Sequence, residues 1–383
     1  MTRVKTLVIT NFSTHYRAPL FELMHQRLGA EFIFFSRGGE NYWQPHLGVT
    51  GGGFPATTVD ATHSIGKVRV NTSLWHEILS RDFDVMIKCI NGRVELPLAY
   101  AAARRKGAAF VLWTGMWMHP RTPFHFMSRP LARQIYRHSD AIVTYGEHVK
   151  RFVVHEGADS AKVFAAGNAT NNQLYGRDVS QEEIDLVRKR YGIGEEPVVL
   201  AVSRLVKQKG IEYLIEAVAL LESRPKLLIV GTGQLADDLR ALAAARNVDL
   251  VLAGGLQPAD MPAMYASANV FVLPSVTTRV FRETWGLACN EAMCQGVPVI
   301  CTDAVGAAAG GLVEHGVTGL VVPERDVVSL SEMIHRLLSD GEYARRIGES
   351  GRRRVQTVTY DRMVDAFASA IEYAVSSRGR GGS

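Results

Sequence analysis

Two glutamates, Glu283 and Glu291, lie eight positions apart on either side of Gly286. The apolar run after Gly286 predicts a helix that ends near Gly296. Residues at this spacing return to nearly the same side of a helix, because eight residues are a little over two turns. The unpaired amides at a helix start suit a phosphate, and carboxylates suit hydroxyl groups. The segment therefore predicts a site for a ligand that carries both, such as a nucleotide sugar. The alternative is a surface glutamate before an ordinary amphipathic helix.

Two cations follow a predicted strand earlier in the same half of the chain. The strand covers 197–203, and Arg204-Leu-Val-Lys-Gln-Lys209-Gly210 leads from it into a helix over 211–222. An arginine can make a forked contact with a phosphate, and a lysine acts as a point charge. Arg204 and Lys209 are therefore predicted to bind a diphosphate, and Lys207 to be solvated. The alternative is that all of them are ordinary surface charges.

Two turns follow further strands of this half. Gly231-Thr-Gly233 comes after the strand predicted over 226–230, and Leu256 lies in a turn after the strand over 248–253. The first turn lacks the third glycine and the later acidic residue of a dinucleotide site, which argues against a nicotinamide-dependent dehydrogenase. Both turns lie at carboxyl ends of strands, where open α/β sheets bind ligands.

Together these segments resemble the donor site of the family-4 retaining glycosyltransferases, which have GT-B architecture. The resemblance rests on Glu283-x7-Glu291, on the run Glu291-Ala-Met-x-x-Gly-x-Pro-Val-Ile, and on Arg204-x4-Lys209-Gly. It implies that Arg204 and Lys209 stabilise the charge on the leaving diphosphate, while Glu291 holds the ribose and Glu283 a sugar hydroxyl. The further donor contacts that it implies are at Gly231, Gly233, Leu256, Trp285, Gly286 and Leu287.

The loop after the first predicted strand carries candidates for acceptor binding. The strand covers 4–10, and His15, Tyr16 and Arg17 follow it before a helix. A loop in this position is where an open α/β sheet binds its ligand. Many members of the resembled family have a glycine-rich loop here, and this sequence does not.

A second loop of the first half offers Trp117 and His119, after the strand predicted over 109–113. The flat face of Trp117 could stack on an acceptor sugar. The resemblance implies that His119 faces the donor sugar and takes part in catalysis. The alternative is a histidine that caps its own loop beside Pro120.

The charge of +5 is unevenly distributed, because residues 1–180 hold 21 Lys and Arg against 13 Asp and Glu. This balance suggests an anionic partner, such as a membrane surface or a phosphate-bearing acceptor. Nucleic acid fits less well, since no basic stripe alternates with stacking aromatics. Arg129, Arg133 and Arg137 form a basic edge on a predicted helix, which is either a contact with an anionic membrane or an ordinary surface.

Asp82-Phe83-Asp84 matches the Asp-x-Asp metal motif of a different glycosyltransferase fold, GT-A. It precedes a predicted buried strand, where aspartates commonly serve turns and caps. We therefore expect a structural role and no metal or other cofactor.

The 383 residues and 47% hydrophobic content allow two to three globular domains. No apolar run approaches the roughly 18 residues that span a bilayer. The four cysteines show no pairing motif and favour a reducing cytoplasm, with possible peripheral contact at the inner membrane face.

We expect an α/β protein of two Rossmann-like domains that face a cleft. The first domain covers 1–173 and also includes the last helix and tail, 360–383, which return to it. The second domain covers 174–359. The resemblance implies retaining transfer of a hexose-type sugar, without a metal, from a nucleoside diphosphate sugar to a hydroxyl. The acceptor is a glycan, as in polysaccharide biosynthesis, a lipid-linked sugar or a small molecule. Alternatives are a nucleotide-sugar epimerase and a non-catalytic nucleotide-sugar-binding subunit.

Overall fold

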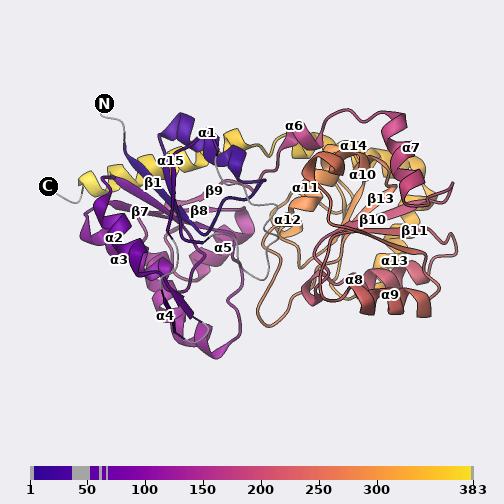
Figure 1. Ribbon diagram of the computed structural model, residues 1–383, viewed down its shortest axis with the longest axis horizontal. Helices are drawn as coiled ribbons and strands as arrows, with labels where there is room; N and C mark the ends of the chain where they lie inside the picture. Colours follow the sequence, from indigo (N-terminus) through magenta and orange to yellow (C-terminus); the bar gives the residue numbers. More distant parts are fainter. Residues whose placement is uncertain (1–3, 37–51, 60–62, 66–67, 381–383) are drawn as a thin grey trace. The chain divides into compact units, whose positions relative to one another are not determined.

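The computed structural model describes residues 4–36, 52–59, 63–65 and 68–380, and the chain divides into two compact units. The first unit contains Met1–Gly167 and Tyr360–Ser383, and the second contains Asn168–Thr359 (Figure 1). The boundary predicted from the sequence was after residue 173, whereas the structure divides the chain after Gly167. Asn172 lies in the second unit because its amide donates hydrogen bonds to the carbonyls of Val355 and Val358, at 3.1 and 3.0 Å.

The first unit is built on a parallel sheet of seven strands in the order β3-β2-β1-β6-β7-β8-β9. Its central strands are apolar and buried along their whole length, as in parallel sheets that are covered on both faces. The strands are β1 (Thr6–Thr10), β2 (Glu31–Phe34), β3 (Ala56–Thr58), β6 (Val85–Cys89), β7 (Ala109–Thr114), β8 (Ala141–Thr144) and β9 (Val163–Ala165). A separate antiparallel pair consists of β4 (His63–Ile65) and β5 (Val68–Val70).

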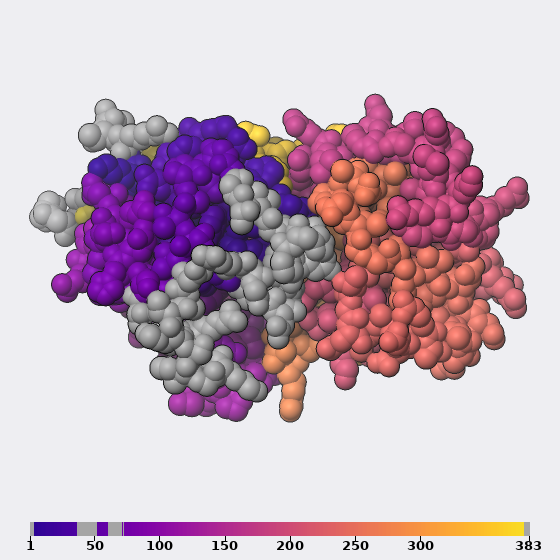
Figure 2. Space-filling model, in the orientation of Figure 1, coloured from indigo at the N-terminus to yellow at the C-terminus, as the bar shows by residue number. Residues whose placement is uncertain are grey.

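Helices follow the strands of the first unit in sequence, and the last helix of the chain joins them. They are α1 (Ala18–Leu28), α2 (Thr72–Ser80), α3 (Glu95–Arg105), α4 (Pro123–His138), α5 (Glu147–His155), the 3₁₀ turn η2 (Ser160–Lys162) and α15 (Tyr360–Arg380). The ring of Phe367 on α15 lies 5.1 Å from the ring of Trp113 on β7. The hydroxyl of Tyr360 donates a hydrogen bond to the Tyr16 carbonyl at 2.7 Å. The predicted return of the last helix to the first unit is thus observed, and indigo residues of α1 meet yellow C-terminal residues in Figure 2.

The second unit has a parallel sheet of six strands in the order β12-β11-β10-β13-β14-β15. The strands are β10 (Val198–Val202), β11 (Lys226–Val230), β12 (Leu250–Gly254), β13 (Val270–Leu273), β14 (Val299–Thr302) and β15 (Leu320–Val322). The helices and 3₁₀ turns are α6 (Asn172–Tyr175), α7 (Gln181–Arg190), η3 (Lys207–Lys209), α8 (Ile211–Ala219), α9 (Ala236–Ala245), η4 (Pro258–Asp260), α10 (Met261–Ala266), α11 (Leu287–Cys294), α12 (Gly306–Ala309), α13 (Val327–Ser339) and α14 (Gly341–Val355).

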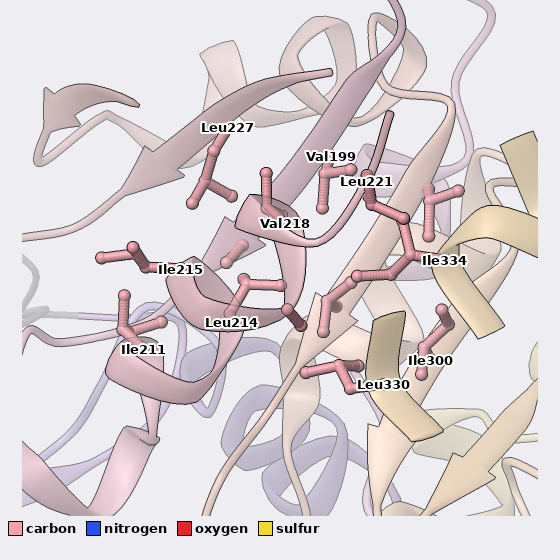
Figure 3. Packing of buried hydrophobic residues seen from close by; sticks show 14 of the residues in the cluster. Val199, Ile211, Leu214, Ile215, Val218, Leu221, Leu227, Ile300, Leu330 and Ile334 are labelled. Carbon is pink, nitrogen blue, oxygen red and sulfur yellow. The ribbon is translucent and has the colours of Figure 1, made fainter. Parts of the chain in front are cut away.

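The core of the second unit anchors the turn that carries the predicted cations. Leu214 and Val218 of α8 pack with Val199 of β10 and Ile334 of α13 in one buried cluster (Figure 3). Full burial of each such side chain contributes about 1.5–3 kcal/mol. Because β10 and α8 are both held in this core, the short turn between them has little freedom.

The order of the strands determines where loops diverge. The chain runs outward from β10 through β11 to β12, and then begins again at β13 on the other side of β10. The loops after β10 and β13 therefore leave the sheet in opposite directions, and this is where doubly wound sheets bind ligands. No helix among the described residues combines the length and apolar character needed to cross a bilayer.

Candidate active site

The loops that follow β10 and β13 touch each other at this switch point. The Val276 amide donates a hydrogen bond to the Gln208 carbonyl at 3.0 Å. Gly210 ends the first loop with a φ of 61°, and a side chain at this position would overlap the carbonyl oxygen of Pro274. The positive φ and the close approach both require glycine, and they bring Lys209 toward the second loop.

Lys209 and Glu283 form a buried ion pair across these loops. The Lys209 ammonium donates to Oε2 of Glu283, and the two side chains are only 13% and 9% exposed. The Ser275 hydroxyl donates to the same carboxylate oxygen at 3.1 Å. The ring of Phe281 lies beneath the ammonium, with its centroid at 5.9 Å. Because a buried charge is costly without a partner, each of these two residues stabilises the other.

Arg204 lies half-buried at the carboxyl end of β10, against the glycine turn after β11. The Leu205 amide donates to the Thr232 carbonyl at 2.9 Å. Gly231 has a φ of 141°, and a side chain there would overlap the Ser203 carbonyl, while one at Gly233 would overlap that of Leu205. These glycines therefore allow the turn after β11 to pack closely against the backbone of the turn that carries Arg204. Lys207 on the same turn is exposed, as predicted.

Glu291 lies on α11, which begins after Gly286 in a left-handed conformation with a φ of 95°. Its Oε2 accepts a hydrogen bond from the Tyr265 hydroxyl at 2.6 Å. Burial raises the pKa of the Glu291 carboxyl to about 7, although hydrogen bonds from Tyr265 and Tyr175 act in the opposite direction. This carboxyl therefore changes its charge near neutral pH.

The segment from Glu283 to Gly286 is held in place by its backbone and by one buried indole. The Gly306 amide donates to the Glu283 carbonyl at 3.1 Å. The Trp285 side chain is 3% exposed, and its indole N–H donates to Asn290 at 2.8 Å. Trp285 thus lies in the core, which leaves its backbone for the predicted donor contact. Gly286 and Leu287 are half-buried at the helix start, and Leu256 is half-buried beyond β12, at the edge of the sheet.

His119 belongs to a cluster of charges within the first unit. Its Nε2 lies 3.2 Å from Oε2 of Glu156, whose side chain is 2% exposed. Arg129 and Arg133 contact the same carboxylate at 2.7 and 2.8 Å. Burial lowers the pKa of His119, and the arginines overcome the burial of Glu156 and hold its pKa at about 2. His119 thus has a carboxylate partner on α5, within the first unit.

The predicted basic edge of α4 takes part in the same cluster. Arg129 and Arg133 contact Glu156 while their side chains stay 41% exposed, and Arg137 is exposed further along the helix. Glu156 lies far from both arginines in sequence, at the end of α5, and its spacing carries no signal that could have predicted this contact.

The first loop also differs from the expectation for acceptor binding. Arg17 is 7% exposed and donates a hydrogen bond to the Tyr145 hydroxyl at 3.0 Å. Its guanidinium lies 4.9 Å from the ring of Trp113. The carbonyl of Tyr16 is held by α15, and the half-buried His15 ring packs edge-on against Tyr16, at 5.3 Å. Arg17 is therefore a cation of the core of this unit, and it is not available for an acceptor.

Trp117 is half-buried, and its indole packs edge-on against His148, at 5.0 Å between centroids. Asp82 pairs with the Lys5 ammonium, and Asp84 accepts the Lys5 amide at 2.8 Å. Both aspartates thus brace the start of the chain. Within the described ranges, no group of three or more His, Cys, Asp or Glu side chains is arranged to hold a metal ion.

Residues 183–354 match the family model described as glycosyl transferases group 1. The alpha-D-kanosaminyltransferase of Streptomyces kanamyceticus is 29% identical over 242 residues, which are 61% of each chain. A GDP-mannose-dependent phosphatidylinositol monomannoside mannosyltransferase of Mycobacterium tuberculosis is 37% identical over 176 residues, 44% of this chain and 45% of that protein. The chain thus matches less than two thirds of the length of either relative.

Solved structures resemble nearly the whole chain. Anabaena HepE, in complex with UDP and glucose, aligns with a TM-score of 0.77 at 19% identity and covers 96% of this chain and 99% of its own. Sucrose-phosphate synthase of Thermosynechococcus elongatus aligns with a TM-score of 0.74 at 18% identity, covering 95% and 98%. The chain therefore has the GT-B fold of two parallel-sheet α/β domains, and residues 183–354 are similar in sequence to the glycosyl transferases group 1 family.

Proposed function

We propose that this protein is a retaining glycosyltransferase of family 4, which moves a hexose-type sugar from a nucleoside diphosphate sugar to an acceptor hydroxyl. The buried Lys209–Glu283 pair at the switch point of the second unit is the observation that carries the proposal. An ammonium suits a phosphate and a carboxylate suits a hydroxyl, so these two adjacent side chains suit a ligand that carries a diphosphate next to a sugar.

The difficult step is the separation of an anionic diphosphate from a sugar that becomes positively charged. In the proposed reaction, the bond from the anomeric carbon to the β-phosphate oxygen breaks and a bond to the acceptor oxygen forms on the same face. The acceptor proton passes to the leaving diphosphate. Arg204, Lys209 and the first amides of α11 stabilise the charge that grows on the phosphate. Glu283 holds a sugar hydroxyl, and Glu291 holds the ribose.

The names of similar proteins support this class of donor. The mycobacterial relative is named as GDP-mannose-dependent, and HepE has been solved with UDP-glucose. The acceptor class that we propose is a glycan or a lipid-linked sugar, because the matches include a capsular polysaccharide biosynthesis glycosyltransferase of Staphylococcus aureus and the phosphatidylinositol monomannoside enzyme.

A thermal-shift screen of the purified protein against UDP-, GDP- and ADP-sugars tests the donor site. A ligand at 100 times its Kd should add about 2.7 kcal/mol of stability. Lys209→Ala should remove the shift, and Lys207→Ala, which alters an exposed lysine of the same turn, should preserve it. The absence of any shift, or an equal effect of the two variants, would refute the site.

Product analysis separates the proposed transfer from its alternatives. A transferase releases nucleoside diphosphate and forms a glycoside when an acceptor is present. An epimerase converts the sugar of the donor without an acceptor. A binding subunit would retain the thermal shift and form no product with any acceptor offered.

A further inference from the structure

An exposed apolar face lies on the N-terminal half of α4 in the first unit. Phe126 and Met127 are each 80% exposed, and no other large apolar side chain of the described residues exceeds 60%. Phe124 and Leu131 on the same helix are 42% and 49% exposed. We call Phe124, Phe126, Met127 and Leu131 the α4 face. Four large apolar side chains that gather on one short stretch of surface indicate a site of interaction.

The α4 face belongs to the exposed first part of a helix whose later part is buried. Ile135 and Tyr136, one to two turns further on, are buried in the unit at 2% and 1% exposure. Met127 and Leu131 are four residues apart and share one side of the helix. Ile135 follows Leu131 by four residues on the same side, so this side of α4 passes from the surface at Met127 and Leu131 into the core at Ile135.

The charged side chains that α4 itself contributes are all basic. The helix Pro123–His138 contains no Asp or Glu. Arg129 and Arg133 lie toward Glu156, while Arg121 and Arg137 are exposed near the two ends of the helix. An apolar surface with cations at its border is complementary to the headgroups of an anionic bilayer.

We propose that the α4 face docks on an anionic lipid bilayer, with Phe126 and Met127 inserted among the headgroups. A second copy of the chain fits less well, because a two-fold contact would bring Arg121 and Arg137 of both copies together. An acidic protein partner would satisfy the cations but is not required by the four apolar side chains. The proposal does not depend on the donor site of the second unit.

Flotation of the full chain with lipid vesicles tests this docking. We expect the protein to bind vesicles with about one third phosphatidylglycerol, to bind pure phosphatidylcholine weakly, and to dissociate as salt rises. The double substitution Phe126→Ser and Met127→Ser should weaken binding about tenfold or more. Arg121→Gln and Arg137→Gln should each weaken binding to anionic vesicles about fivefold.

The matched control is Leu186→Ser with Leu220→Ser, which removes two exposed apolar side chains of the second unit, 60% and 58% exposed. This control should bind vesicles like the unaltered protein. Equal binding by the α4 variant, or no vesicle binding by the unaltered chain, would overturn the proposal. Sedimentation that shows a dimer lost only in the α4 variant would instead assign the face to self-association. Unchanged thermal unfolding of each variant verifies the fold.

Discussion

Replacement of Glu291 by Gln should change how the stability of the protein depends on pH. Burial raises the pKa of this carboxyl from 4.5 to about 7 in the folded state. Between these values the folded protein binds more protons than the unfolded chain, so the free energy of unfolding falls as pH rises through this window. The full penalty above pH 7 is about 3 kcal/mol, and about 2 kcal/mol of it develops between pH 5.5 and 8. Gln stays neutral and does not incur it.

Urea or thermal unfolding at pH 5.5 and pH 8 measures this difference. The advantage of Glu291→Gln over the unaltered protein should grow by about 2 kcal/mol between the two pH values, or roughly 4–8 °C in Tm for a unit of this size. Glu332→Gln, at an exposed position of α13, is the control and should show no such change. If Glu291→Gln and the unaltered protein keep a constant difference in stability at both pH values, the carboxyl is not held neutral by burial and the reasoning is wrong.

Three further substitutions test the site and its support. Glu283→Gln should bind nucleoside diphosphate at least as tightly as the unaltered protein in calorimetry, because Lys209 is released from its pair, while transfer falls about 100-fold; weaker diphosphate binding would contradict this. Gly210→Ala should lower the free energy of unfolding in urea by about 1–3 kcal/mol more than Gly192→Ala. Both glycines have a φ of 61°, but only at Gly210 does a side chain meet a neighbouring loop, so equal losses would exclude the clash. Leu214→Ala should cost about 2–5 kcal/mol in the same assay, and a loss below 1 kcal/mol would show that the cluster in Figure 3 does not anchor α8.

The second unit could be predicted well from sequence because its chemistry is local. Arg204 and Lys209 lie on one short turn, and the strand before it and the helix after it have clear apolar patterns. Glu283 and Glu291 are carried by one motif. The direct pairing of Lys209 with Glu283 could not be predicted, because it depends on β13 lying beside β10 in the sheet.

Other contacts of the site come from residues that carry no local pattern. Ser275 donates to Glu283 from the end of β13, and Tyr265 donates to Glu291 from a different helix. A polar residue directly after a buried strand was a usable signal for Ser275. From the sequence, Tyr265 is indistinguishable from an ordinary core aromatic. Only the packing of α10 against α11 brings its hydroxyl to Glu291.

The first unit was predicted less well, because its polar side chains find partners far away in the sequence. Arg17 and His119 look like ligand contacts when only their loops are considered. In the folded unit, Arg17 lies among the rings of Tyr145 and Trp113, and His119 contacts Glu156. Sequence spacing shows which residues could take part in chemistry. The long-range packing determines which of them are already paired with other side chains of the protein.

The return of α15 to the first unit has a consequence for the order in which the chain can mature. The second unit is one continuous segment and can complete its core as soon as residue 359 has left the ribosome. The first unit begins earlier but must wait for Phe367 and Tyr373, which cover Trp113 and Phe164. The first unit is therefore completed after the second, and until α15 arrives the rings of Trp113 and Phe164 lack these partners, which favours aggregation of the unfinished unit.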